Sequence, residues 1–136
     1  MKHLGTRKIE TNRLVLRKLR KDDAFDMFDN WCNDGEVTKF LSWFPHGKIE
    51  VTFEILDKWI SSYSSNKFYL YGIEFKENHE LIGTINGFNV NKNSIEIGYC
   101  IAKKYWNKGF TTEALNEVTK YFIDQCEIET VYAKHI

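Results

Sequence analysis

The hydrophobic period of this chain changes twice, and this change limits the folds open to it. Apolar residues recur every three or four positions between residues 49 and 63, which is typical of an amphipathic helix. Between residues 68 and 101 the period falls to two, in three segments separated by short polar turns, which favours an antiparallel meander. A helical period returns from Ala114 to Cys126. We therefore expect helices and a sheet in one fold.

The other segments complete an order of strand, two helices, three strands, helix and strand. Residues 13–19 predict the first strand, and a helix should follow with Asp22 as its N-cap and end at residues 33–35. The later strands are expected at residues 68–75, 81–90, 94–101 and 130–133. The predicted fold class is α/β (mixed α+β), one domain over residues 1–136 with helices packed against a central, mostly antiparallel sheet.

Charge and cysteine content exclude several classes of partner. Lys plus Arg and Asp plus Glu both number 19, so the formal net charge is zero, whereas proteins that hold nucleic acid by its phosphates usually carry a basic excess. We expect neither nucleic acid nor membrane as the main partner. The cysteines (Cys32, Cys100 and Cys126) and the scattered histidines show no metal-site spacing, which favours reduced thiols in a cytoplasmic protein without a metal.

The segment from Glu96 to Ala114 carries the clearest chemical signal. A strand runs into a short loop that contains Gly109, and a helix begins at once. The first amides of a helix have no internal partners, and the helix dipole makes this end positive, so it suits an anion. Gly109 allows close approach of the backbone, and the hydroxyls of Thr111 and Thr112 can add hydrogen bonds. This pattern predicts a phosphate or diphosphate site.

Two familiar phosphate loops do not fit. A Walker loop needs Gly-Lys-Ser/Thr, but the chain has Lys108-Gly109-Phe110, which is the wrong order. The dinucleotide fingerprint needs three spaced glycines in a βαβ unit, and here a meander precedes the loop.

The same segment resembles the coenzyme A-binding signature of the GNAT superfamily of N-acetyltransferases. It reads Glu-Ile-Gly-Tyr at residues 96–99 and Tyr-Trp-Asn-Lys-Gly-Phe-Thr-Thr-Glu-Ala at residues 105–114. More narrowly, it is similar to the branch of ribosomal-protein N-terminal (alanine/serine) acetyltransferases. Residues 11–17, 22–24 and 81–88 resemble the opening strand, first helix and central strand of that branch, so the resemblance covers nearly all of the chain.

Two departures from the family pattern fall in the loop. Asn107 replaces the usual glycine after the tryptophan, and Thr111 stands where glycine or alanine is usual. Asparagine tolerates a left-handed backbone better than most residues, so we expect the loop to keep its shape and binding to persist.

The resemblance implies acetyl-CoA as cofactor. It implies that pantetheine is held by main-chain groups of Tyr99, Cys100 and Ile101. It also implies that the diphosphate rests on the amides of Asn107, Lys108, Gly109, Phe110, Thr111 and Thr112. Lys103, Lys104 and Lys108 either attract the phosphates or form a solvated turn. We expect Trp106 to pack beneath the loop.

The implied reaction is direct attack of a neutral amine on the thioester, which needs positioning, a polarised carbonyl and a proton acceptor. Glu96 is the candidate base, through a water molecule, because strand alternation places it on the same face as the small Gly98, which leaves room for a substrate. The alternative is a structural or solvated glutamate. Cys100 has no histidine nearby in sequence, so it is interpreted as a buried residue and not a nucleophile. Glu113 is expected to cap the helix or play a structural role.

The sequence constrains the identity of the amine acceptor less than it constrains the cofactor. The resemblance places Trp43, Phe44 and His46 at the border of the acceptor pocket, although aromatic density is more often core. A protein α-amine has a pKa near 8, against about 10.4 for lysine, so more of it is neutral at pH 7 and a protein N-terminus is favoured. A small amine such as an antibiotic or polyamine, and a non-catalytic acyl-CoA sensor, remain alternatives. A monomer or a homodimer would fit.

The resemblance also implies more chain than this sequence contains. In the family, another helix and two strands follow the strand expected at residues 130–133, and they often carry a tyrosine acid. The domain is therefore expected to be C-terminally incomplete at Ile136.

Overall fold

A central sheet organises the molecule, and the computed structural model describes residues 2–35 and 46–133. The 6-stranded sheet has the order β1-β2-β3-β4-β5-β6. Its strands are β1 (Ile9–Glu10), β2 (Leu14–Arg17), β3 (Tyr69–Phe75), β4 (Leu81–Phe88), β5 (Ser94–Ile101) and β6 (Thr130–Tyr132). Strands β1 to β5 pair antiparallel, whereas β6 pairs parallel with β5. The predicted mixed α+β fold with a mostly antiparallel sheet is confirmed.

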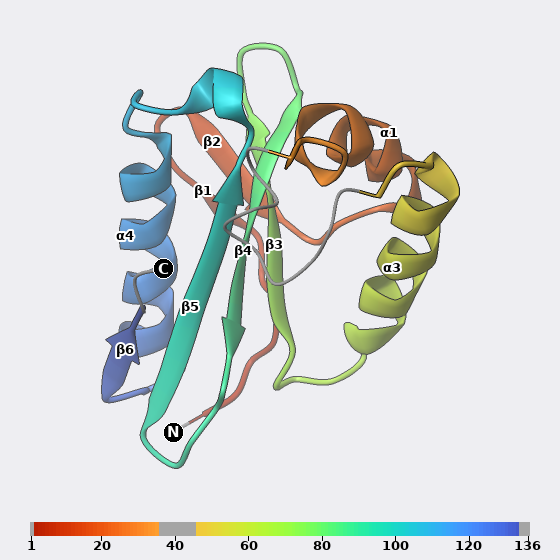
Figure 1. Cartoon of the computed structure of the whole chain (residues 1–136). Coiled ribbons are helices and arrows are strands. Elements are labelled where there is room, and N and C mark those ends of the chain that lie inside the picture. Colours follow the sequence, from red (N-terminus) through yellow and green to blue (C-terminus); the bar gives the residue numbers. More distant parts are fainter. Residues whose placement is uncertain (1, 36–45, 134–136) are drawn as a thin grey trace.

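Helices cover both faces of this sheet (Figure 1). Helix α4 (Phe110–Asp124) lies on one face, and α1 (Ala24–Met27) and α3 (Ile49–Ser62) lie on the other. The 3-10 turn η1 (Lys21–Asp23) precedes α1, the π turn η2 (Phe28–Cys32) follows it, and the 3-10 turn η3 (Lys103–Tyr105) connects β5 to α4. Within residues 2–35 and 46–133, no helix has the length and apolar character needed to cross a bilayer.

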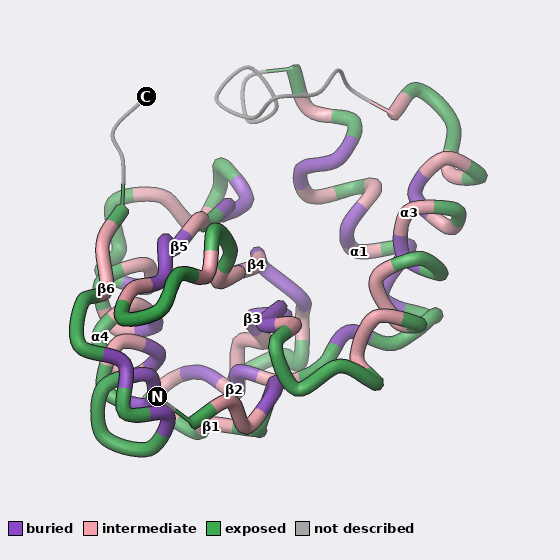
Figure 2. Tube along the Cα trace, turned by 90° about the horizontal axis from the view of Figure 1, so that it is seen from below, coloured by how far each residue is buried: buried purple, intermediate pink, exposed green. Residues whose placement is uncertain are grey.

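Strand alternation divides the core into two clusters, as the period of two predicts. Figure 2 marks the buried residues along the strands and helices. On the α4 side, Ile95, Ile97 and Ile101 pack with the apolar residues of α4. On the α1 and α3 side, Cys100 packs with Leu56, Leu70 and Leu81 among others. Both faces of β5 are thus largely buried, and β5 is fixed between two hydrophobic layers.

The first helix differs from the expectation. Asp22 was expected as its N-cap, but the carboxylate that accepts a backbone hydrogen bond there is that of Asp23, from the N–H of Arg20 at 2.6 Å. Asp23 also pairs with Arg17, whose Nε contacts Glu74 Oε1 at 2.8 Å. This largely buried charge network joins η1 to β2 and β3. Because Asp23 and not Asp22 belongs to it, Asp23 accepts the backbone hydrogen bond at the start of the helix.

The strand limits differ by a few residues, and β1 was not predicted. Its two residues are too few to show a period, and they are recognisable only by their pairing, Ile9 with Leu16 and Glu10 with Val15. Strand β2 ends at Arg17 and β4 at Phe88, each two residues before the expected end.

Candidate cofactor-binding site

The loop before α4 presents a row of unpaired backbone donors. Asn107 and Gly109 have left-handed φ angles of 61° and 79°, which Asn and Gly tolerate. The first helical hydrogen bond runs from Glu113 N–H to Gly109 C=O at 3.1 Å. In the described part of the chain, the backbone N–H groups of residues 107–112 donate to no protein acceptor. Unpaired amides at a helix start are what an anion site requires.

Trp106 supports this loop from below, as expected. Its Nε1–H donates to the carbonyl of Ile101 at 2.7 Å, and its ring packs against both core clusters. The neighbouring Tyr105 donates its hydroxyl to Glu80 Oε1 at 2.9 Å. The loop is therefore attached at its start to the end of β5 and to the β3–β4 turn.

The upper part of β5 has an open edge beside the loop. In the described residues, parallel pairing with β6 covers only Ser94–Glu96 of β5. Ala102 N–H donates to Ile82 C=O at 2.8 Å, so antiparallel alternation directs the main-chain groups of Ile101 and Tyr99 away from β4. The Ile101 carbonyl accepts from Trp106, which leaves both main-chain groups of Tyr99 and the N–H of Ile101 at this edge.

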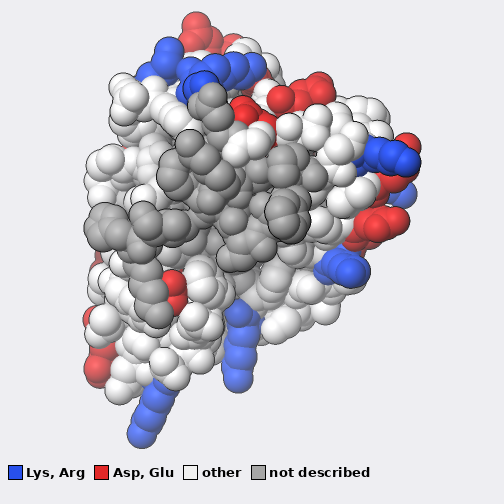
Figure 3. Space-filling view, in the orientation of Figure 1, with Lys and Arg blue, Asp and Glu red and all other residues white. Residues whose placement is uncertain are grey.

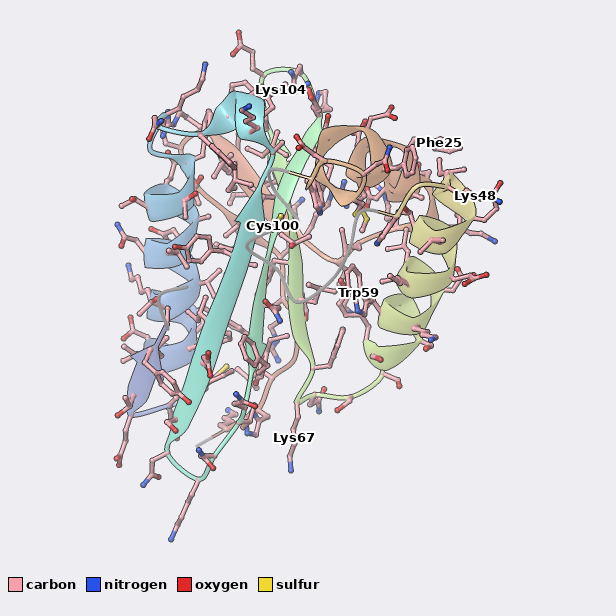
Figure 4. The ribbon with its side chains drawn as sticks, in the orientation of Figure 1. Phe25, Lys48, Trp59, Lys67, Cys100 and Lys104 are labelled. Atoms are coloured by element: carbon pink, nitrogen blue, oxygen red, sulfur yellow. The ribbon has the colours of Figure 1, made fainter. Side chains whose placement is uncertain are left out.

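Cys100 differs from its neighbours in this respect. It is paired with Thr84, in the register that directs its main-chain groups into the β4–β5 ladder. Its side chain points into the α1 and α3 side of the core, and burial raises the pKa of the thiol to about 12 (Figure 4). The thiol is protonated near neutral pH, which agrees with a packing role and not with a nucleophile.

Basic side chains gather above η3 and the start of α4 (Figure 3). Lys104 contacts Glu80 Oε2 at 2.7 Å, and this carboxylate raises the pKa of the lysine. Lys103 and Lys108 are exposed. Of the three lysines considered as phosphate contacts, Lys104 thus has a carboxylate partner, whereas Lys108 lies within the row of free amides.

Glu113 faces away from that row. Its Oε1 accepts from Arg13 Nε at 2.7 Å, and its Oε2 accepts from the Arg13 backbone N–H at 2.9 Å and from the Thr11 hydroxyl at 2.5 Å. Burial opposes ionisation, but the hydrogen bonds from Thr11 and Arg13 outweigh it and lower the pKa of Glu113. The carboxylate is structural, as expected.

Glu96, the candidate base, is 6% exposed and accepts a hydrogen bond from Asn89 Nδ2 at 2.9 Å. It shares its face with Gly98, as expected. The space beside Gly98 is filled, however: a Cβ there would lie 2.7 Å from Asn86 Oδ1 and 3.0 Å from the Phe88 ring. The room for a substrate that was expected at Gly98 is taken by these two side chains from the neighbouring strand.

His46 contacts two elements. Its ring Nδ1 lies 2.5 Å from the Thr52 hydroxyl, and its backbone N–H donates to the Cys32 carbonyl at 2.8 Å. Burial lowers the pKa of the imidazole. It thereby connects the start of α3 to the end of η2. Trp43 and Phe44, the other two expected acceptor contacts, lie outside the described residues.

Sequence reasoning missed the contacts of Arg13, Thr11 and Asn89. Arg13 and Glu113 are about a hundred positions apart, and no local period connects them. Asn89 gave a weak signal, because asparagine is enriched at left-handed positions, and its φ is 49° at the end of β4.

Residues 13–136 match the family model described as an acetyltransferase (GNAT) domain. The chain belongs to the GNAT family of acetyltransferases.

Among its relatives, the chain is 34% identical over 116 residues to YoaA of Bacillus subtilis (strain 168), an uncharacterized N-acetyltransferase, covering 83% of this chain and 64% of that protein. It is 30% identical over 127 residues to p20 of Bacillus licheniformis, also an uncharacterized N-acetyltransferase, covering 91% and 70%. The chain thus spans about two thirds of the length of these relatives.

Solved structures share the fold. A GNAT-family acetyltransferase from Bacillus anthracis superposes with a TM-score of 0.81 at 23% identity, covering 93% of this chain and 72% of the other. A ribosomal-protein alanine acetyltransferase from Vibrio fischeri gives 0.78 at 16% identity, covering 93% and 73%.

Proposed function

We propose that this chain binds acetyl-CoA and that the protein transfers the acetyl group to a primary amine. The observation that carries the proposal is the row of unpaired N–H groups at residues 107–112, next to the open edge of β5. These amides suit a diphosphate, and an extended acyl arm can pair with strand groups beside it. Family membership supports the same cofactor.

The residues at the edge of β5 suit the main-chain roles. The Tyr99 and Ile101 N–H groups and the Tyr99 carbonyl can hydrogen-bond a pantetheine arm, and one of these amides can stabilise the oxyanion that develops during attack. We assign no such contact to the main chain of Cys100, because it is paired with β4.

The acetyl-transfer step then requires few side chains. The amine nitrogen attacks the thioester carbon, the C–S bond breaks, and the sulfur leaves as a thiolate. Because the reference pKa of a thiol is about 8.5, the thiolate is a tolerable leaving group and a strong acid is not essential. The amine proton passes to Glu96 through water, because Asn86 and Phe88 occupy the space beside Gly98 that a directly contacting amine would need. Asn89 holds one carboxylate oxygen of Glu96 by its 2.9 Å hydrogen bond and so restricts the orientation of the base.

The acceptor we propose is the N-terminal α-amine of a protein. The lower pKa of an α-amine leaves more of it neutral at pH 7, so a single carboxylate base suits it better than it suits lysine. The structural likeness to a ribosomal-protein alanine acetyltransferase agrees with this choice through the fold.

The test combines binding and turnover. Titration with acetyl-CoA followed by calorimetry should show one site. Thiol release should occur with peptides that start with alanine or serine, and acetylation of the α-amine should be visible by mass spectrometry. Release only with polyamines or aminoglycosides would contradict the acceptor, binding without release on any amine would indicate a sensor, and no binding would refute the proposal.

Glu96→Gln tests the base. We expect kcat to fall by about 10²–10⁴-fold, the range for general bases, with the Kd for acetyl-CoA unchanged. Glu54→Gln, an exposed glutamate on α3, is the matched control and should retain wild-type kcat. A Glu96→Gln variant with normal kcat would remove Glu96 from the mechanism.

A further inference from the structure

We propose that Arg13 is a positioning residue for the cofactor, because it fixes the orientation of the amide that faces the diphosphate. This inference rests on the proposed function. Arg13 immediately precedes β2 and is far from the loop in sequence, yet its side chain contacts three parts of the loop and helix.

The first contact sets a peptide plane. Arg13 Nη1 donates to the carbonyl of Lys108 at 3.1 Å. In a trans peptide, the carbonyl and the following N–H point in opposite directions, and no cis peptide is present. The Gly109 N–H must therefore point away from Arg13, toward the side where it has no protein acceptor. A rotation of this peptide would turn a carbonyl toward the anion instead.

The second contact holds Arg13 itself. Its Nε and backbone N–H donate to the two oxygens of Glu113, which is in the first turn of α4. A free carboxylate there would repel a diphosphate, whereas this one is neutralised and turned toward the β1–β2 turn. Thr11 completes the arrangement with its 2.5 Å hydrogen bond.

The third contact is a cation–π contact. The guanidinium carbon lies 4.2 Å from the centroid of the Phe110 ring. Phe110 is 4% exposed, and its ring packs edge-on against Phe75 with the centroids 5.1 Å apart. The guanidinium is thus held over a buried ring while it donates to the loop. Lysine has neither the fork nor the plane needed to satisfy Glu113, Lys108 and Phe110 together.

Arg13→Lys and Arg13→Ala test the inference in calorimetric titrations with CoA and with pantetheine, which lacks the diphosphate. We expect the Kd for CoA to rise at least tenfold in both variants while the Kd for pantetheine stays unchanged. At saturating acetyl-CoA, kcat should stay within about twofold of wild type. Arg20→Ala removes an exposed arginine of an exposed ion pair and is the charge-matched control, with an unchanged Kd for CoA.

The outcomes separate this inference from the proposed function. If wild type fails to bind CoA, the proposed function fails. If wild type binds CoA and Arg13→Lys binds it equally well, the function stands and the positioning role is refuted. Equal weakening toward CoA and pantetheine would also refute it, because a general loss of structure affects both ligands. If Arg13→Ala does not fold, Arg13→Lys carries the test.

Discussion

At the scale of single residues, the conformation of the backbone sets the geometry of the loop before α4. Asn107 and Gly109 take left-handed angles, and between them the Lys108 carbonyl turns toward Arg13. The tolerance of asparagine for such angles was predictable, and the observed φ of 61° at Asn107 agrees with it. The Arg13 contact was not predictable, because it depends on how β2 lies beside α4.

Gly109→Ala tests the loop, and Gly47→Ala is its matched control. Both glycines have left-handed φ angles, 79° and 72°, so each alanine should cost about 1 kcal/mol of folding free energy. A Cβ at Gly109 would also lie 3.4 Å from Arg13 Nη2, whereas one at Gly47 meets nothing within 4 Å. Urea unfolding should show similar losses, and only Gly109→Ala should weaken CoA binding. Equal CoA affinity in the two variants would show that the loop backbone does not touch the ligand.

At the scale of elements, helix α4 joins the site to the core. Its N-terminus presents the free amides, and its inner face buries Phe110, Ala114, Val118, Tyr121 and Phe122. The helical period predicted this face from Ala114 onward, because buried positions recur every three or four residues. The helix begins at Phe110, directly after its N-cap Gly109, as the strand, loop and helix pattern of residues 96–114 predicted.

Phe122→Ala measures how firmly α4 is anchored. Phe122 is 0% exposed and packs edge-on against Tyr69 with ring centroids 4.9 Å apart, so the change should cost about 3–5 kcal/mol in unfolding free energy. The adjacent Ile123 is 45% exposed, and Ile123→Ala should cost about 0.5 kcal/mol or less. Comparable losses in the two variants would mean that α4 is rotated from the orientation described.

At the scale of the whole molecule, one sheet separates two hydrophobic layers. Leu56 belongs to the α1 and α3 side and Val118 to the α4 side, and both are fully buried. Because these residues belong to different core clusters on opposite faces of the sheet, the effects of Leu56→Ala and Val118→Ala on the unfolding free energy should be additive within about 0.5 kcal/mol. Denaturant unfolding of the two single variants and the double variant measures each loss of unfolding free energy. A double-variant loss that differs from the sum of the single losses by more than about 0.5 kcal/mol would indicate that strain passes through the sheet.

The order of elements was predictable because each long segment had a clear period, as residues 49–63 and 94–101 show. The free amides of residues 107–112 were predictable for the same local reason, since helix starts lack internal acceptors. Contacts between distant segments were not. Asn86 and Phe88 fill the space beside Gly98, and this depends on the β4–β5 register, which no single segment encodes.

The burial of all three cysteines has a practical consequence for assays of the proposed acetyl transfer. Cys32, Cys100 and Cys126 are enclosed, and burial raises the pKa of the Cys32 and Cys100 thiols. A chromogenic disulfide reagent needs an accessible thiolate, so native protein should react slowly, and reaction should reach three thiols per chain only after denaturation. Colour that develops during an acetyl-transfer assay can then be assigned to the thiol of the released CoA alone.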